Sequence, residues 1–295
     1  MKISKELQTL LDDGVIDEVL RSLKSGKEAA VYIVRVGSEI RCAKVYKNMA
    51  QRSFQQRAHY QEGRKVRGSR RTRAMNRRSK FGRKEEESAW KNTEVDALYQ
   101  LTAAGVRVPR PYAYTDGVLV MELITDDEGH AAPGLGKVDL TREKALEHHR
   151  FLMRQVQLML CAGLIHGDLS EYNVLVGAEG PVIIDLPQIV NAAGNNSARA
   201  MLLRDVDNLT DTLVRFAPEL STTRYGEELW QLFERGQLRA DTVLTGEFED
   251  DERTADVEGV QQIIEHARDE AERRERGREE ADGKSPGKHP PHDKS

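Results

Sequence analysis

Residues 165–176 read IHGDLSEYNVLV, and residues 183–185, at the end of an apolar run, read IID. Phosphoryl transfer needs an acceptor oxygen in line with the transferred phosphate and cations that absorb its charge. Asp168 is the candidate for orienting a hydroxyl acceptor and taking its proton. Asn173 and Asp185 supply the hard oxygen ligands that Mg²⁺ prefers in proteins. These residues therefore predict Mg²⁺-assisted phosphoryl transfer.

The spacing H-x-D-x-x-x-x-N, followed by a distant Asp, is that of the catalytic loop and metal-binding Asp of kinases. Each residue also has an ordinary alternative: His-Gly-Asp as a turn with a capping Asp168, and Asp185 as a turn residue at a strand end. The complete set, in order and flanked by apolar strands, favours the chemical interpretation.

Lys44 lies in the run AKVYK, in the second strand of an expected hairpin over residues 29–47. We expect its ammonium to project into the cleft between two lobes, pair with the phosphates of ATP, and be held there by a Glu of the next helix. Glu94 is the best candidate in that helix, which is expected to end at Gly105. Three other acids, at residues 85–87, compete for the role.

The expected hairpin is preceded by a turn, Ser25-Gly26-Lys27-Glu28-Ala29. It holds a single glycine, so it is neither a Walker A loop nor a G-x-G-x-x-G loop. Its amides and the hydroxyl of Ser25 are expected to contact phosphates. Taken alone, the same residues are an ordinary entry to a hairpin.

The apolar run LVMELI (119–124) leads into an acidic loop. In a kinase fold this segment is the hinge, where backbone groups near Glu122 and Ile124 bind the adenine edge and Met121 lines the pocket. Without the other motifs, the run predicts only a buried strand.

Strands come first and helices later, which predicts an α+β fold with two lobes. The N-lobe is expected at residues 1–121, with a flexible basic loop at about 51–88, and the C-lobe at 122–250. Residues 251–295 predict a charged helix extension and a disordered tail. Leu, Val and Ile at helical spacing over residues 5–24 predict one or two short amphipathic helices.

Cysteine usage and hydropathy favour the cytoplasm. Cys42 and Cys161 are far apart and form no C-x-x-C motif, which argues against a disulfide framework or a cysteine zinc site. The N-terminus has no apolar signal core, and no stretch approaches the roughly 20 apolar residues of a membrane span. His148 and His149 have no partner pattern for zinc and are expected at the surface.

The formal net charge is only −4, so any contact with nucleic acid is expected to be local. Residues 64–84, RKVRGSRRTRAMNRRSKFGRK, are dense in arginine and fit salt-dependent binding to RNA. A solvated basic loop, or one that grips an acidic protein, fits the same residues equally well.

Together, these motifs resemble the RIO-type atypical serine/threonine protein kinase family, and specifically its type-one branch in a short, bacterial-like form. The resemblance covers most of residues 7–235. It is carried by SGKEAAVY (25–32), AKVYK (43–47), VMELI (120–124), HGDLSEYNVLV (166–176), IIDLPQIV (183–190) and RDVDNLTDTL (204–213).

The resemblance implies a two-lobed protein-kinase-like fold with a small β-rich N-lobe, a helical C-lobe and no standard activation segment. It implies ATP with Mg²⁺, or Mn²⁺ in its place, Asp168 as the catalytic base, and Asn173 and Asp185 as metal ligands. The protein substrate would be another chain or the protein itself. In this family the metal-binding Asp also accepts phosphate, so an ATPase switch is implied as well, and relatives act in ribosome maturation.

Two departures from ordinary protein kinases leave the class of substrate open. Gly167 stands where H-R-D kinases carry Arg, and Asp185-Leu186-Pro187 replaces D-F-G. A small-molecule kinase of the aminoglycoside or choline type is the first alternative, because HGDL with a following Asn also fits those enzymes. The second is an RNA-binding assembly factor that uses the fold as a nucleotide switch, with ribosomal RNA or a ribosomal subunit as partner.

Overall fold

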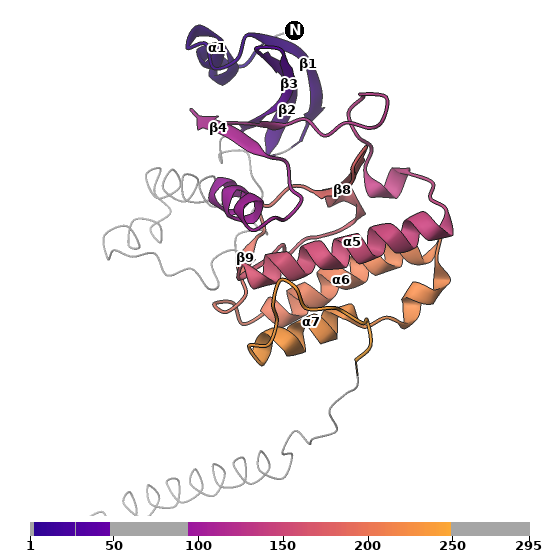
Figure 1. Cartoon of the computed structure of the whole chain (residues 1–295). Coiled ribbons are helices and arrows are strands. Elements are labelled where there is room, and N and C mark those ends of the chain that lie inside the picture. Colours follow the sequence, from indigo (N-terminus) through magenta and orange to yellow (C-terminus); the bar gives the residue numbers. More distant parts are fainter. Residues whose placement is uncertain (1–2, 27, 48–93, 249–295) are drawn as a thin grey trace, which may run out of the picture. The chain divides into compact units, whose positions relative to one another are not determined.

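The computed structural model of the chain describes residues 3–26, 28–47 and 94–248. The described part begins with helix α1 (Lys5–Asp12) and an antiparallel sheet in the order β1-β2-β3-β5-β4 (Figure 1). Residues 94–103, which precede β4, are helical. The strands are β1 (Glu18–Ser25), β2 (Ala29–Val36), β3 (Glu39–Tyr46), β4 (Pro111–Thr115) and β5 (Val118–Glu122).

The hairpin predicted over residues 29–47 is confirmed. Strand β2 pairs with β3 in a regular register that sets Val31 opposite Lys44. Strands β4 and β5 form a second hairpin, closed by Asp116 and Gly117 at φ values of 50° and 77°. Positive φ at both central residues is what a two-residue hairpin turn of this type requires.

The prediction of helix through residues 5–24 is wrong in its second half. Helix α1 ends near Gly14, which has a φ of 67°, and residues 18–25 form strand β1. Strand β1 hydrogen-bonds to the edge of β2 with two register shifts, and its side chains are largely exposed. The spacing of Leu20 and Leu23 therefore does not mark a buried helical face, because neither residue is buried.

Three helices dominate the second half of the described chain: α5 (Arg142–Cys161), α6 (Ala198–Val214) and α7 (Tyr225–Glu234), packed on one another (Figure 1). Shorter elements connect them: η3 (Leu135–Lys137), β6 (Leu164–Ile165), η4 (Glu171–Asn173), β7 (Val174–Gly177), β8 (Gly180–Ile183), β9 (Val190–Asn191) and η5 (Pro218–Thr222). The fold is thus α+β, two-lobed and protein-kinase-like. Only residues 186–197 separate Asp185 from α6, too short a stretch for a standard activation segment. None of the described helices is both long and apolar enough to cross a bilayer.

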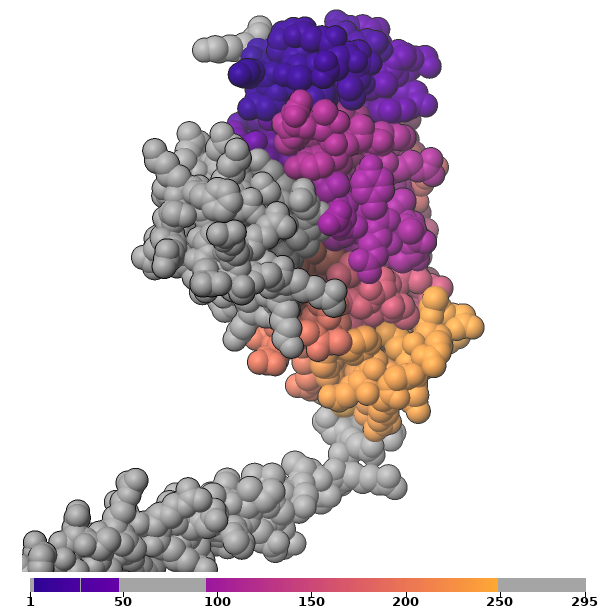
Figure 2. Space-filling view, turned by 90° about the vertical axis from the view of Figure 1, so that its left-hand side faces the viewer, coloured from indigo at the N-terminus to yellow at the C-terminus, as the bar shows by residue number. Residues whose placement is uncertain are grey.

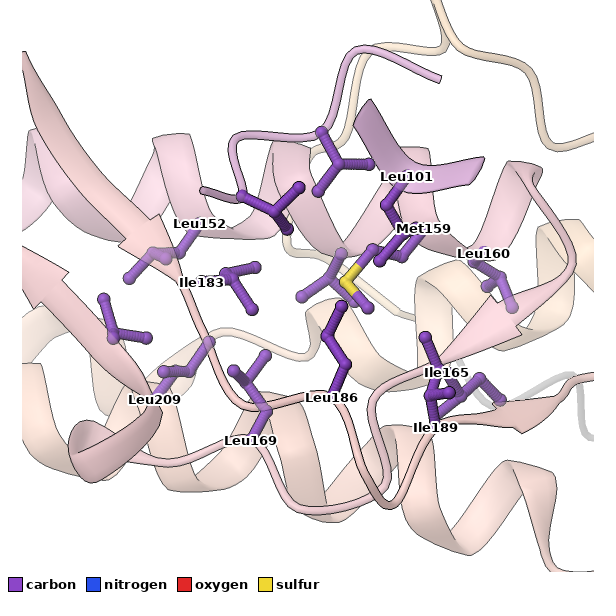
Figure 3. Packing of buried hydrophobic residues seen from close by; sticks show 14 of the residues in the cluster. Leu101, Leu152, Met159, Leu160, Ile165, Leu169, Ile183, Leu186, Ile189 and Leu209 are labelled. Atoms are coloured by element: carbon purple, nitrogen blue, oxygen red, sulfur yellow. The ribbon is translucent and has the colours of Figure 1, made fainter. Parts of the chain in front are cut away.

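The sheet has a hydrophobic cluster on each face. On one face, Leu7 and Leu10 of α1 pack with Val34, Val45 and Val120. The cluster on the other face continues through helix 94–103 into the C-terminal helices. Figure 3 shows part of this second cluster, to which four different elements contribute Leu101, Met159, Ile183 and Leu209. Burial of apolar surface therefore holds the two lobes together.

Helix 94–103 lies between the sheet and the C-terminal helices. Figure 2 shows the described surface running from the sheet in indigo, past this helix in purple, to α7 in orange. A side chain at the first turn of the helix is thus placed near β3, the strand that carries Lys44.

The expectation of surface histidines in α5 is wrong. His148 and His149 are both buried. His149 Nε2 and Thr210 Oγ1 of α6 are hydrogen-bonded at 2.9 Å, and the ring of Tyr225 in α7 lies 5.4 Å from the His149 ring. Burial lowers the pKa of His149 to about 4, so this imidazole is neutral in the folded protein.

His149 should make the folded protein less stable in acid. Its unfolded pKa is close to 6.5 and its folded pKa is lower, so the unfolded chain binds the extra proton, and stability is lost as pH falls through this window. From pH 7.5 to pH 5 we expect a loss of roughly 2 kcal/mol from this residue. Urea unfolding at both pH values measures the loss. His149→Gln should flatten the dependence, whereas the exposed control His130→Gln should not; equal slopes in all three proteins would contradict the assignment.

Candidate active site

Lys44 is the centre of the site. It lies in β3, paired with Val31 of β2 and Leu119 of β5. Its ammonium is 2.6 Å from Oε1 of Glu94 and 2.9 Å from Oδ1 of Asp185. The structure thus brings together three of the predicted site residues. Residues 85–87, the competitors of Glu94, lie outside the described part of the chain.

These three charges stabilise one another. Burial lowers the pKa of Lys44, but the carboxylates of Glu94 and Asp185 more than offset it and hold this pKa well above its usual value. Burial raises the pKa of Asp185, and the nearby ammonium outweighs that effect, so the pKa is lowered. Lys44 is a cation and Asp185 an anion over the whole neutral range.

The loop that carries Asp168 is hydrogen-bonded to Ile184, the residue before Asp185. The side-chain nitrogen Nδ2 of Asn173 donates to the backbone carbonyl of Asp168 at 2.8 Å, and the backbone carbonyl of Asn173 accepts from the N–H of Ile184 at 2.9 Å. His166 Nε2 donates to the carbonyl of Ile184 at 3.1 Å. Asp185 itself has a φ of 64°, a left-handed value that is uncommon outside glycine. The predicted base and the two predicted metal ligands are therefore held in one connected unit.

Gly167 cannot be exchanged for the arginine of H-R-D kinases without moving the chain. Its φ is 79°, and a Cβ added there would lie 2.8 Å from the carbonyl oxygen of Gln188. Because that neighbour is backbone, it has little freedom to move away. The departure from H-R-D is thus built into the local fold.

Helix α6 hydrogen-bonds to the predicted catalytic loop. The buried carboxylate of Asp205 accepts the N–H groups of Gly167 at 2.8 Å and Leu169 at 2.9 Å. Arg204 donates to the carbonyl of Gly167, and Asn208 donates to the carbonyl of Leu169 at 2.9 Å. Burial raises the pKa of Asp205 overall, because its effect is larger than that of the two hydrogen bonds to its carboxylate, which lower this pKa. Four hydrogen bonds from one helix fix the backbone on both sides of Asp168.

The predicted phosphate turn joins β1 to β2. Ser25 ends β1, Ala29 begins β2, and the N–H of Gly26 donates to the carbonyl of Ala29 at 2.9 Å. Glu28 precedes β2 and accepts a backbone hydrogen bond from Lys47. Lys27 lies outside the described residues.

The predicted hinge follows β5. The carboxylate of Glu122 forms two hydrogen bonds of 2.8 Å with Arg107 and accepts the N–H of Arg110 at 3.1 Å. The carbonyl of Ile124 accepts from the N–H of Ala132 at 2.9 Å. Burial raises the pKa of Glu122, and its partners, Arg107 foremost, lower it overall. The Glu122 side chain thus braces the hinge, and Met121 is partly buried against the core.

A model of the RIO domain matches residues 30–225. The chain belongs to the RIO domain family. The match contains every predicted site residue from Lys44 to Asp185, whereas residues 25–29 of the phosphate turn precede it. The family expectation is therefore confirmed on the part of the chain that carries the catalytic loop.

Similar proteins with the RIO domain occur in archaea and eukaryotes. The "RIO-type serine/threonine-protein kinase Rio1" of Haloferax volcanii is 35% identical over 208 residues, covering 68% of this chain and 65% of that protein. The human "Serine/threonine-protein kinase RIO1" is 30% identical over 217 residues, covering 73% of this chain and 36% of its own length. This chain therefore spans between about a third and two thirds of these relatives. A crystal structure of a kinase domain matches with a TM-score of 0.44 and 12% identity, over 68% of this chain and 63% of that one.

Two residues of this RIO domain site are not indicated by the sequence motifs. Asp205 lies in the run RDVDNLTDTL; its signal in the sequence is an acidic residue on the buried face of an amphipathic helix, in line with Leu202 and Leu209. Lys47 lies in the run AKVYK, and its ammonium contacts Ser25.

Proposed function

We propose that this chain is an ATP- and Mg²⁺-dependent phosphotransferase, acting as a RIO-type serine/threonine protein kinase and as an ATPase switch. The observation that carries the proposal is the ammonium of Lys44, held between Glu94 and Asp185 beside the loop of Asp168. An ammonium with two carboxylate partners keeps a third donor for a phosphate oxygen. The names of the relatives support the serine/threonine acceptor, and the lone cysteines favour the cytoplasm.

The proposed chemistry assigns one task to each group. Lys44 binds the nucleotide phosphates, and Asp168 orients the acceptor hydroxyl and takes its proton. The residues present fit a divalent cation: Asp185 is ionised, and the amide nitrogen of Asn173 is turned to the loop, which directs its Oδ1 away from the loop. Bound there by Asp185 and Asn173, Mg²⁺, or Mn²⁺, would neutralise phosphate charge.

The hinge is proposed to bind adenine through its backbone. The N–H of Glu122 already donates to the carbonyl of Arg110 at 2.8 Å, and the carbonyl of Ile124 is paired with Ala132. We therefore assign the adenine edge to the carbonyl of Glu122 and the N–H of Ile124, with Met121 lining the pocket. The Glu122 carboxylate takes no part, since Arg107 holds it.

Transfer of the γ-phosphate of labelled ATP tests the proposal. Wild-type protein and Asp168→Asn are incubated with Mg²⁺ and three acceptors: the chain itself, a generic basic protein, and a mixture of choline and an aminoglycoside. Label on serine or threonine supports the kinase. Label on the small molecules alone would favour the small-molecule alternative. Transfer to a serine, threonine or other hydroxyl acceptor that survives Asp168→Asn would contradict the assigned base.

Contact with ribosomal RNA, and a role in ribosome maturation, rest on the basic residues 64–84, which lie outside the described part of the chain. Deleting them is expected to weaken RNA binding and flatten its salt dependence, by about 0.9 or less in log–log slope for each lost phosphate contact. Filter binding to ribosomal RNA at several salt concentrations measures the slope. A shuffled segment of equal composition is the control, and an unchanged slope after deletion would assign the segment to a protein partner instead.

A further inference from the structure

Lys47 follows directly on β3 and contacts the phosphate turn at three points. Its backbone N–H donates to the carbonyl of Glu28 at 2.8 Å. Its ammonium donates to Oγ of Ser25 at 3.0 Å and to the carbonyl of Gly26 at 2.7 Å. One lysine, three residues after Lys44, thus reaches across from β3 to the end of β1.

These contacts determine what the turn offers to an anion. An ammonium is only a donor, so Ser25 Oγ must accept from Lys47, and the hydroxyl proton of Ser25 is directed elsewhere. The carbonyl oxygen of Gly26 is occupied by the same ammonium. Phosphate oxygens accept hydrogen bonds and repel carbonyl oxygens. With Lys47 in place, the turn presents a hydroxyl donor and a positive charge.

Lys47 and Lys44 are held by different partners. Lys44 is fixed by the carboxylates of Glu94 and Asp185, whereas the described contacts of the Lys47 ammonium are to the neutral groups of Ser25 and Gly26. Its positive charge is therefore not cancelled by an acid within these contacts. A charge-assisted contact of this kind is stronger than a neutral one and favours a phosphate nearby.

We propose that Lys47 is a positioning residue for the nucleotide phosphates, which acts by orienting the Ser25 hydroxyl as a donor and by adding positive charge at the turn. The inference rests on the proposed function, because only a nucleotide site brings phosphate to this turn. It adds a second lysine to the site, with a task separate from that of Lys44.

The test measures binding of ATP and of adenosine, which lacks phosphates, by titration calorimetry. Lys47→Met should weaken ATP binding about tenfold and leave adenosine binding unchanged. The loss should shrink in a Ser25→Ala background, because the two residues act through one contact. Lys144→Met is the matched control: that lysine is exposed on α5, paired with Glu147, and should change neither affinity.

Three results would overturn the inference: unchanged ATP affinity, equal losses for ATP and adenosine, or losses for Lys47→Met and Ser25→Ala that simply add. Thermal unfolding without nucleotide shows whether Lys47→Met is folded. If it is not, Lys47→Gln, which keeps a donor but lacks the charge, is used in its place. If the wild-type protein binds no ATP, the proposed function is contradicted as well. If the wild-type protein binds ATP and transfers phosphate, and Lys47→Met behaves identically, only this inference is contradicted.

Discussion

Replacement of Asp168 by Asn is expected to abolish phosphate transfer to a hydroxyl acceptor while leaving ATP binding largely intact. The proposed task of Asp168 concerns the acceptor, whereas Lys44 and the hinge concern the nucleotide. Proton transfer by a positioned carboxylate is typically worth about 10²–10⁴ in rate. Initial rates with labelled ATP, together with ATP affinity by calorimetry, give the two quantities for the same protein preparation.

The control for this substitution is Asp211→Asn, an exposed residue of α6 with the same change of charge. It should keep the wild-type rate, as should any change that affects only the net charge of the helical lobe. Asp168→Ala should match Asp168→Asn in rate, because neither side chain can accept the proton. Near-normal turnover of the Asn variant would remove Asp168 from its proposed role.

The position of the predicted catalytic loop, between a helix and a strand, could be predicted from the sequence because its contacts are local. Asn173 binds the carbonyl of Asp168 only five residues away, and the loop is flanked by strands whose apolar runs are unmistakable. The contact of Lys44 with Asp185 spans 141 residues, and no local pattern implies it. The motifs predicted Glu94 as the partner of Lys44 and a metal-binding role for Asp185, but not a direct contact between Lys44 and Asp185. Its role in chemistry remains a prediction.

The features that the sequence did not predict have a common physical cause: they depend on what covers a residue. Helix α5 contacts α6, α7 and β8, so polar residues on more than one face of it, such as His149 and Gln157, become buried. A sequence pattern is usually interpreted on the assumption that a helix has one buried apolar stripe and a solvated opposite face, and α5 does not meet that assumption. In strand β1 the same assumption fails in the opposite way, since the apolar side chains of Leu20 and Leu23 remain 40% and 39% exposed.

Asp205 and Lys47 show a third limit. Each contacts a segment distant in sequence: Asp205 accepts backbone N–H groups, and the Lys47 ammonium donates to the Ser25 hydroxyl and the Gly26 carbonyl. Backbone groups in particular leave no trace in residue patterns. The N–H groups that Asp205 accepts belong to Gly167 and Leu169, whose side chains make no such demand. The sequence shows Asp205 only as an acidic residue on an apolar helix face and Lys47 only as a lysine at the end of a strand, and both patterns are common without a functional role.

The second large effect concerns Asp185 as a phosphate acceptor. The side chain of Asp185 is ionised and 48% exposed despite its contact with Lys44, so one carboxylate oxygen can attack the γ-phosphorus. In the proposed reaction, a bond would form between that oxygen and phosphorus while the bond from phosphorus to the β–γ bridging oxygen breaks, and ADP would leave with the electron pair. Water would then hydrolyse the acyl phosphate, which would restore the carboxylate and release inorganic phosphate.

Asp185→Asn is therefore expected to lose the covalent label and the ATPase activity together, while Lys44 still supports weak nucleotide binding. Wild-type protein labelled with [γ-³²P]ATP should hold the label in acid and release it to hydroxylamine. The comparison with Asp168→Asn sharpens the test: an ionised carboxylate has no proton to be removed before attack, so that variant should still form the label. A label that resists hydroxylamine, maps to serine or threonine and disappears in Asp168→Asn would instead leave plain autophosphorylation, with Asp185 serving only as a metal ligand.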